Sequence, residues 1–272
     1  MSGDCNFITQ ALERLRARRP LVHNITNYVV MNFTANTLLS LGASPLMAHA
    51  EEEAAELADI TNALVINIGT LSTLWVKAMF LAARAAREKN LPIVFDPVGS
   101  GATSFRTLTS RRFVEEIKPT VLRANASEIL SFAAQGSGGK GVDATHTVEQ
   151  ARVTAIALAR KYGMTVAVTG AEDFITDGQR EARVNNGDPL MSYITGSGCA
   201  ASAITAAFCA IEPDAFKAAV AALTVLGIAG ECAASDKPRP GTFLIKLLDE
   251  LNAVDASRIQ VMSRVSIEDC KC

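Results

Sequence analysis

The sequence has 272 residues, of which 49% are hydrophobic, and a formal net charge of −2 at pH 7. A chain of this size and composition buries a substantial core, which excludes a disordered or fibrous protein. Lys and Arg are interspersed with Asp and Glu, so no basic stripe supports a nucleic-acid or anionic-membrane partner. The expected partner is a small molecule or a second copy of the chain.

Three features of the sequence indicate where in the cell the protein is found. Residues 1–20 contain no apolar core of signal-peptide type, and the longest apolar stretches, 200–211 and 218–230, are too short to span a bilayer. The six cysteines form no Cys-x-x-Cys pair, which argues against a zinc site and a disulfide framework. We expect a soluble, cytoplasmic protein.

Apolar strand-like segments alternate with amphipathic helical segments through the first two thirds of the chain. The strand-like segments are 20–25, 44–48, 63–68, 92–96, 120–124 and 164–170, and the helical segments include 30–42, 51–60, 73–90 and 145–163. Strands that are apolar on both faces, each followed by a helix-length connection, predict a parallel sheet covered by helices on both sides. The predicted class is α/β.

The pattern changes after Gly170. The short, turn-bounded pieces 174–178, 181–187 and 190–196 predict an antiparallel extension of the sheet. Residues 198–234 and 241–253 have helical character, the Gly-rich piece 134–143 is expected to be a loop, and the tail after Val254 has no clear pattern. Because no linker or repeat is visible, we expect one domain over residues 1–272.

Ligands of an open parallel sheet bind at the carboxyl ends of its strands. The residues just past each predicted strand are rich in Gly, Asn, Asp and Thr. They are Thr26 and Asn27, Met47, Gly69 and Thr70, Asp96 to Gly101, Asn125 to Glu128, Thr169 and Gly170, and Gly196 to Cys199.

The stretch ITGSGCAASA, residues 194–203, places Gly196 and Gly198 directly before a helix of small residues. Glycines allow a sharp turn that aims the first N–H groups of the helix at one point, which suits a phosphate. A tight turn before a close-packed helix is the alternative. The stretch also matches G-x-G-x-x-A, so a nicotinamide-dependent oxidoreductase is a rival, although no strand follows to complete a βαβ unit.

Two acidic residues lie on adjacent predicted loops. Asp96 ends a buried strand, and Glu128 follows Asn125 by three residues. Together they could hold a Mg²⁺ that keeps several waters and bridges ATP phosphates, with Arg123 approaching a phosphate. The spacing of Asn125 and Glu128 is equally that of a helix capping box, and Asp-Pro is common turn chemistry, so a purely structural role stays open for both carboxylates.

Several of these motifs carry a family likeness. They include PLVHNITNYVVMNFTANTLLSLGASPLMAHAEEE, VFDPVGSGAT, LRANASEI, GKGVDA, NNGDPLM and ITGSGCAASA. Over residues 18–250 the chain resembles the hydroxyethylthiazole kinases, the thiamine-salvage members of the ribokinase-like superfamily. The resemblance implies a three-layer α-β-α fold with a mostly parallel central sheet. It also implies a Mg²⁺-dependent transferase that phosphorylates the primary hydroxyl of 4-methyl-5-(2-hydroxyethyl)thiazole with ATP.

The resemblance further implies a homotrimer with thiazole sites at subunit interfaces, and roles for single residues. Asn27, Met47 and Gly196 would contact the thiazole, with Gly69 and Thr70 reaching it from the neighbouring subunit. Arg123 and Thr169 would contact ATP, and Asp96 and Glu128 would organise Mg²⁺.

Cys199 stands where many related kinases carry an aspartate. A cysteine is mainly thiol at neutral pH, and a helix N-terminus is expected to lower its pKa. We expect Cys199 to be the catalytic residue that positions the substrate hydroxyl and modestly accepts its proton, with packing alone as the alternative. A hydroxymethylpyrimidine or pyridoxal kinase, a non-catalytic thiazole-binding protein and a Cys-His hydrolase are rival interpretations of the chain.

Overall fold

The structure, a computed structural model, describes residues 6–133 and 147–270. The predicted loop 134–143, the motif GKGVDA and the first two residues of the predicted helical segment 145–163 lie outside the described residues. The strands are β1 Leu21–Ile25, β2 Ser44–Met47, β3 Ala63–Asn67, β4 Ile93–Asp96, β5 Val121–Asn125, β6 Thr165–Thr169, β7 Asp173–Thr176, β8 Arg180–Val184 and β9 Val265–Asp269. The α-helices are α1 Asn6–Arg18, α2 Met31–Leu41, α3 Thr73–Glu88, α4 Ser104–Ile117, α5 Ala126–Ala133, α6 Val148–Tyr162, α7 Ser197–Cys209, α8 Ala215–Ala234, α9 Pro240–Ala253 and α10 Ala256–Met262.

The described strands form one sheet in the order β2-β1-β3-β4-β5-β6-β7-β8-β9. The pairs from β2 to β6 are parallel, and the pairs from β6 to β9 are antiparallel. The inner parallel strands are buried on both faces, as β3 shows with all five residues buried, whereas the edge strand β2 is half-buried. A run of apolar residues without alternation therefore predicted these strands correctly.

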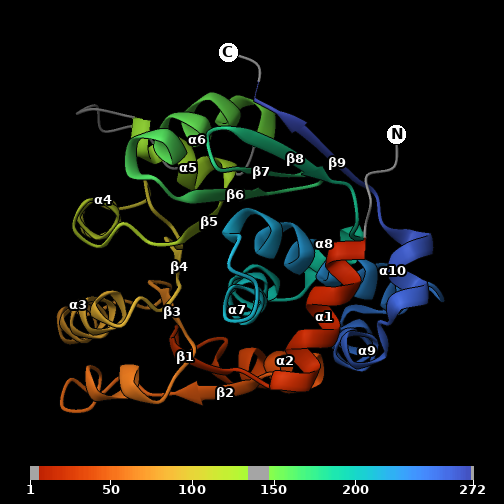
Figure 1. The fold of residues 1–272 in the computed structure, drawn as a ribbon, viewed down its shortest axis with the longest axis horizontal. Coiled ribbons are helices and arrows are strands. Elements are labelled where there is room, and N and C mark those ends of the chain that lie inside the picture. Colours follow the sequence, from red (N-terminus) through yellow and green to blue (C-terminus); the bar gives the residue numbers. More distant parts are fainter. Residues whose placement is uncertain (1–5, 134–146, 271–272) are drawn as a thin grey trace.

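Helices cover both faces of the sheet, which gives three layers (Figure 1). On one face α3, α4, α5 and α6 pack over strand residues such as Leu64 and Ile66. On the other face α1, α2, α7, α8 and α9 pack over strand residues such as Val65, Val94 and Val121. Successive strand residues point to opposite faces, so one apolar strand supplies both cores. The predicted α/β class with a mostly parallel sheet is confirmed.

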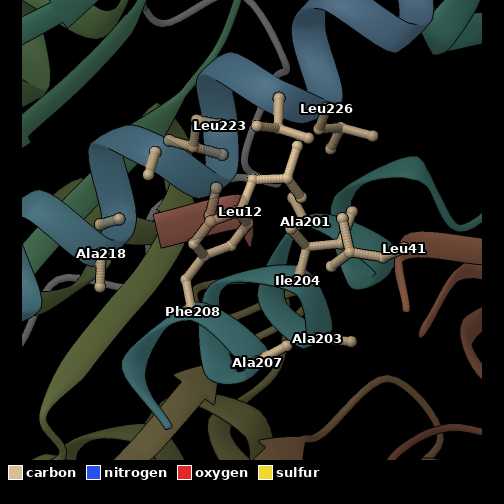
Figure 2. Close-up of a cluster of buried hydrophobic side chains, with 14 of the residues drawn as sticks. Leu12, Leu41, Ala201, Ala203, Ile204, Ala207, Phe208, Ala218, Leu223 and Leu226 are labelled. Carbon is tan, nitrogen blue, oxygen red and sulfur yellow. The ribbon is translucent and has the colours of Figure 1, made fainter. Parts of the chain in front are cut away.

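The helices α7 and α8 form the centre of one core (Figure 2). Ile204 and Phe208 point from α7 toward α8 and fill the space between the two helices, whereas Ala203 and Ala207 lie on the side of α7 that is turned away from α8. Helix α8 is long and apolar enough to cross a membrane, so the expectation based on stretch length is wrong. Most of α8 is buried inside the fold, which is typical of a core helix.

Three local predictions differ from the structure. Residues 51–60 form turns and a short 3₁₀ helix, Glu56–Asp59, instead of an α-helix, because three successive glutamates repel one another and no side chain caps the helix start. Residues 190–196 are not a strand: Pro189–Tyr193 is a 3₁₀ helix, capped by the Asp188 side chain, which accepts from Leu190 N. The tail that showed no pattern forms α10 and the edge strand β9.

Candidate active site

The carboxyl ends of the parallel strands bring the predicted polar residues to one edge of the sheet. Asn67 ends β3 in register with Asp96 at the end of β4. Asn125 ends β5 in register with Thr169 at the end of β6. Side chains far apart in the sequence therefore meet because their strands are neighbours.

Asp96 is the buried centre of this edge, with no exposed surface. Its Oδ2 atom accepts hydrogen bonds from Arg123 Nη1 at 2.9 Å and from Ser202 Oγ at 2.7 Å. Asn67 Nδ2 donates a third at 3.0 Å. Burial raises the pKa of Asp96, and the charge of Arg123 and the hydrogen bonds oppose that rise. Its Oδ1 atom has no hydrogen-bond partner among the described residues.

Arg123 connects Asp96 to the next strand and to the start of α7. Its Nη2 atom donates to Thr169 Oγ1 at 2.8 Å. Burial lowers the pKa of Arg123, but the charges of Asp96 and Glu128 outweigh it and raise the pKa overall, so the guanidinium stays charged. A Cβ atom on Gly198 would lie 2.8 Å from Arg123 Nη2, so only glycine lets the guanidinium lie against the helix start.

The glycine hinge begins α7 as the sequence predicts. Gly196 is the N-cap residue, with φ of 92° in the left-handed region. A Cβ atom there would also meet Val30 Cγ1 at 2.8 Å. The first N–H groups of a helix have no partner within the helix, and they carry the positive end of its dipole. The arrangement suits a phosphoryl group beside Arg123.

Cys199 lies in the first turn of α7 with two amides around its sulfur. Asn67 Nδ2 donates to Cys199 Sγ at 3.2 Å and Asn27 Nδ2 at 3.5 Å. Burial raises the pKa of the Cys199 thiol to about 11, and the charge of Asp96 adds to the rise. The expected lowering of this pKa is therefore wrong, because burial and the charge of Asp96 outweigh the charge of Arg123 and the two amide hydrogen bonds. Cys199 is a neutral thiol.

Residues of two other loops adjoin Cys199. Gly69 N donates to Asn67 Oδ1 at 2.9 Å, and a Cβ atom on Gly69 would lie 2.5 Å from Asn27 Nδ2. Thr70 Oγ1 accepts from Tyr28 N at 3.1 Å. Within one chain, the loops after β1 and β3 therefore meet beside the thiol.

Met47 lies further out at the end of the edge strand β2. Its partner in register is Asn24, three residues before Asn27. Among the described residues, no hydrogen bond joins Met47 to Asn27 or Cys199.

Glu128 has the geometry of a helix cap. Its Oε2 atom accepts from Asn125 N at 2.9 Å, and Asn125 Oδ1 accepts from Glu128 N at 2.8 Å. Its Oε1 atom accepts from Gly99 N at 2.8 Å. Burial and the charge of Asp96 raise the pKa of Glu128, while Arg123 and the backbone donors lower it. A capping box thus describes the contacts of Glu128, which commit both carboxylate oxygens to the backbone.

A cavity of about 690 Å³ opens beside Arg123 and Thr169. It runs from Gly170 and Gly198 at the sheet edge to apolar side chains on α7 and α8. Its lining is Arg123, Asn125, Thr169, Gly170, Ala171, Asp173, Asn186, Gly187, Asp188, Pro189, Met191, Ser192, Ser197, Gly198, Ala201, Leu223, Leu226 and Gly227. The sequence patterns did not predict most of this wall. The motif NNGDPLM, residues 185–191, was a signal that could have found part of it.

The surroundings of the glycine motif exclude a dinucleotide-binding βαβ unit. The 3₁₀ helix Pro189–Tyr193 precedes α7, and α8 follows it. The sulfur of Cys199 also contacts two asparagine amides and not a histidine, among the described residues. The contacts favour neither the oxidoreductase nor the Cys-His hydrolase.

Comparison with solved structures defines the class of fold. The fold is similar to that of a pyridoxal kinase from Staphylococcus aureus, with a TM-score of 0.65 at 16% identity over 92% of this chain and 98% of that chain. That likeness shows the ribokinase-like fold alone. The class that this comparison defines is the ribokinase-like fold.

Closer relatives narrow the class. A model of the hydroxyethylthiazole kinase family matches residues 12–257. A hydroxyethylthiazole kinase from Desulfotalea psychrophila is 47% identical over 97% of both chains. The solved structure of the hydroxyethylthiazole kinase from Pyrococcus horikoshii has a TM-score of 0.90 at 44% identity, covering 97% of this chain and 99% of that one. The chain belongs to the hydroxyethylthiazole kinase family, which confirms the resemblance.

Proposed function

We propose that this chain, as one kinase domain, transfers the γ-phosphoryl group of ATP to the primary hydroxyl of 4-methyl-5-(2-hydroxyethyl)thiazole. Family membership supports the substrate. One structural observation carries the proposal: Gly198 lines the cavity beside Arg123, and the next residue, Cys199, contacts Asn27 on the other loop cluster. A donor site and an acceptor site therefore meet at the start of α7.

The cavity suits a nucleoside triphosphate. Arg123 and Thr169 are proposed to contact the phosphates, and Leu223, Leu226 and Met191 provide an apolar surface for the base. Phosphoryl transfer passes through a loose transition state, so alignment and charge stabilisation supply most of the catalysis. The N–H groups of residues 196–198 and the Arg123 guanidinium would hold the oxygens of the transferred group.

The acceptor side contains Cys199 and the loop that carries Asn27, and Gly69 and Thr70 on the adjoining loop are proposed to reach the alcohol bound by the neighbouring subunit. The neutral thiol is proposed to position the alcohol instead of removing its proton as a thiolate. Gly196 lies at the hinge between the two sites and is proposed to touch the substrate. Met47 is proposed to line the outer part of the thiazole pocket.

A magnesium ion is part of the proposal. Within the described ranges, no group of three or more His, Cys, Asp or Glu side chains could hold a metal ion. Mg²⁺ at kinase sites usually has one or two carboxylates, with phosphates and water as its other ligands. The unpartnered Oδ1 atom of Asp96 fits such a role, and Glu128 fits only through water. When bound, the ion would neutralise charge on the phosphates.

The proposal includes a cytoplasmic homotrimer with acceptor sites completed at subunit interfaces. Large apolar side chains near the acceptor side support an interface, since Tyr28, Val29 and Leu74 are each more than 60% exposed. Light scattering after size exclusion tests it: a mass of three chains is expected, and a monomer at micromolar concentration contradicts it.

Release of ADP tests the activity. The assay compares the thiazole alcohol with pyridoxal and hydroxymethylpyrimidine, each with and without Mg²⁺. Fast ADP release with the thiazole alcohol and Mg²⁺ is expected. A preference for another acceptor refutes the substrate, and binding of the alcohol without ADP release indicates a non-catalytic binding protein.

A further inference from the structure

Arg106 of α4 donates hydrogen bonds to three backbone carbonyl groups. Its Nη1 atom contacts Ile68 O at 2.8 Å and Val98 O at 2.6 Å, and its Nη2 atom contacts Gly69 O at 2.6 Å. Within residues 6–133 and 147–270, no carboxylate forms an ion pair with Arg106. The three hydrogen bonds of the Arg106 guanidinium therefore go to the backbone of two loops.

These two loops, one after β3 and one after β4, border the acceptor side. Gly69 follows β3 and packs on Asn27, one of the two amides at Cys199. Val98 follows Asp96, and the next residue, Gly99, donates to Glu128. Arg106 thus fixes the spacing between the loop beside the thiol and the loop that follows Asp96.

Arg264, between α10 and β9, makes a similar set of contacts on the other side of the site. Its Nε and Nη2 atoms donate to Asn185 O at 2.9 and 2.7 Å. Its Nη2 and Nη1 atoms contact the Glu231 carboxylate at 2.5 and 3.1 Å. The same carboxylate accepts from Gly187 N at 2.8 Å and from Asn186 Nδ2 at 3.0 Å.

The segment held by Arg264 is one wall of the cavity. Asn186, Gly187, Asp188, Pro189 and Met191 all line it. Arg264 itself does not line the cavity and keeps 52% of its side chain exposed. Arg264 therefore holds the cavity wall through hydrogen bonds to its outer side.

We propose that Arg106 and Arg264 are positioning residues, Arg106 for the acceptor alcohol and Arg264 for the nucleotide. The inference rests on the proposed function. Charge-assisted hydrogen bonds to carbonyl oxygens are stronger than neutral ones, and the planar guanidinium makes several at once. Lysine keeps the charge but cannot reproduce the several fixed, planar N–H donors of the guanidinium.

The test compares Arg106→Lys with Arg264→Lys in steady-state kinetics for both substrates. Arg106→Lys should raise the KM for the thiazole alcohol about tenfold and leave the KM for ATP within about twofold. Arg264→Lys should raise the KM for ATP about tenfold and leave the KM for the thiazole alcohol within about twofold. Each variant serves as the control for the other, because a general loss of structure would raise both KM values together.

Matched lysine substitutions on the same helices or nearby provide further controls. Arg112→Lys on α4 and Arg258→Lys on α10 remove arginines whose ion-pair partners, Glu116 and Glu250, lie outside the cavity lining, and both KM values should stay unchanged. Equal increases in both KM values for each variant, or a change in thermal stability alone, overturn the inference. If Arg264→Lys does not fold, Glu231→Gln takes its place, and Arg106→Gln does so for Arg106→Lys.

Failure of the proposed function is distinguishable from failure of this inference. If the wild type does not phosphorylate the alcohol, the proposed function is wrong. Calorimetric titration of ADP and of the alcohol into each variant then still decides whether the two arginines act on separate sites. Unchanged binding of both ligands by both variants rejects the inference.

Discussion

Replacing Asp173 by asparagine should make the free energy of unfolding less dependent on pH. Asp173 lines the cavity and accepts a hydrogen bond from Gly170 N at 3.0 Å. Burial raises the pKa of Asp173 from 3.8 to about 7, against the opposing effects of Gly170 N–H and Arg123. Because the folded pKa is above the unfolded one, this contribution to stability is fully present below pH 4 and is lost as the pH rises through 7.

The magnitude follows from the size of the shift. A rise from 3.8 to about 7 corresponds to about 4 kcal/mol at most. Asp173 is only partly buried and faces the cavity, so solvent screening lowers the expected effect to about 2 kcal/mol. Asp173→Asn keeps the shape and the acceptor for Gly170 N–H but cannot ionise. Its stability relative to the wild type should therefore increase by about 2 kcal/mol between pH 4 and pH 8.

Urea unfolding of the ligand-free chain at a series of pH values measures this difference, with the fluorescence of the single tryptophan, Trp75, as the signal. Asp236→Asn is the control, because a hydrogen bond from Lys246 lowers the pKa of Asp236 and gives the opposite sign of pH dependence. A stability difference for Asp173→Asn that is constant from pH 4 to pH 8 refutes the reasoning.

Three further predictions concern the site. Cys199→Ala should slow single-turnover phosphorylation without lowering thermal stability, whereas Cys199→Asp should stay active; an alanine variant as fast as the wild type removes the proposed role. Glu128→Gln should lower stability by about 1–2 kcal/mol in urea unfolding, since it loses one backbone acceptor. It should also raise the Mg²⁺ requirement, and an unchanged magnesium titration leaves Glu128 as a helix cap. Gly227→Ala should lower the free energy of unfolding by about 1–3 kcal/mol, because its Cβ would lie 2.6–2.7 Å from atoms of Asn186. It should also weaken ADP binding in calorimetry, and a wild-type affinity for ADP contradicts this.

The sheet and its polar edge could be predicted because each depends on local pattern. Strands such as β3 are buried on both faces, so their apolar runs carry the information directly. Once the strands are parallel and adjacent, Asn67 and Asp96 must meet at one edge. The placement of Arg123 beside Asp96 follows from the same rule.

Other features depend on contacts that leave no local pattern. Arg106 binds backbone carbonyl groups, which every residue has, so no partner side chain marks it. Arg264 binds one backbone carbonyl group and the carboxylate of Glu231, 33 residues away, and no local pattern links the two. The pKa of Cys199 is raised chiefly by its burial and then by the charge of Asp96, and neither is visible in the local sequence. The edge strand β9 forms because β8 offers it a partner, and its own residues are mostly exposed.

The two amides at Cys199 determine where its hydrogen can point. Asn67 Nδ2 and Asn27 Nδ2 both direct N–H groups at the sulfur, so the S–H hydrogen must point away from both. Under the proposed function, an alcohol bound beside the thiol would meet a weak donor, and its oxygen would keep a second lone pair for attack on phosphorus. The neutral thiol would not take the hydroxyl proton, which would pass to an oxygen of the transferred phosphoryl group. The helix start proposed to hold the phosphates would then also be the place where the proton is transferred.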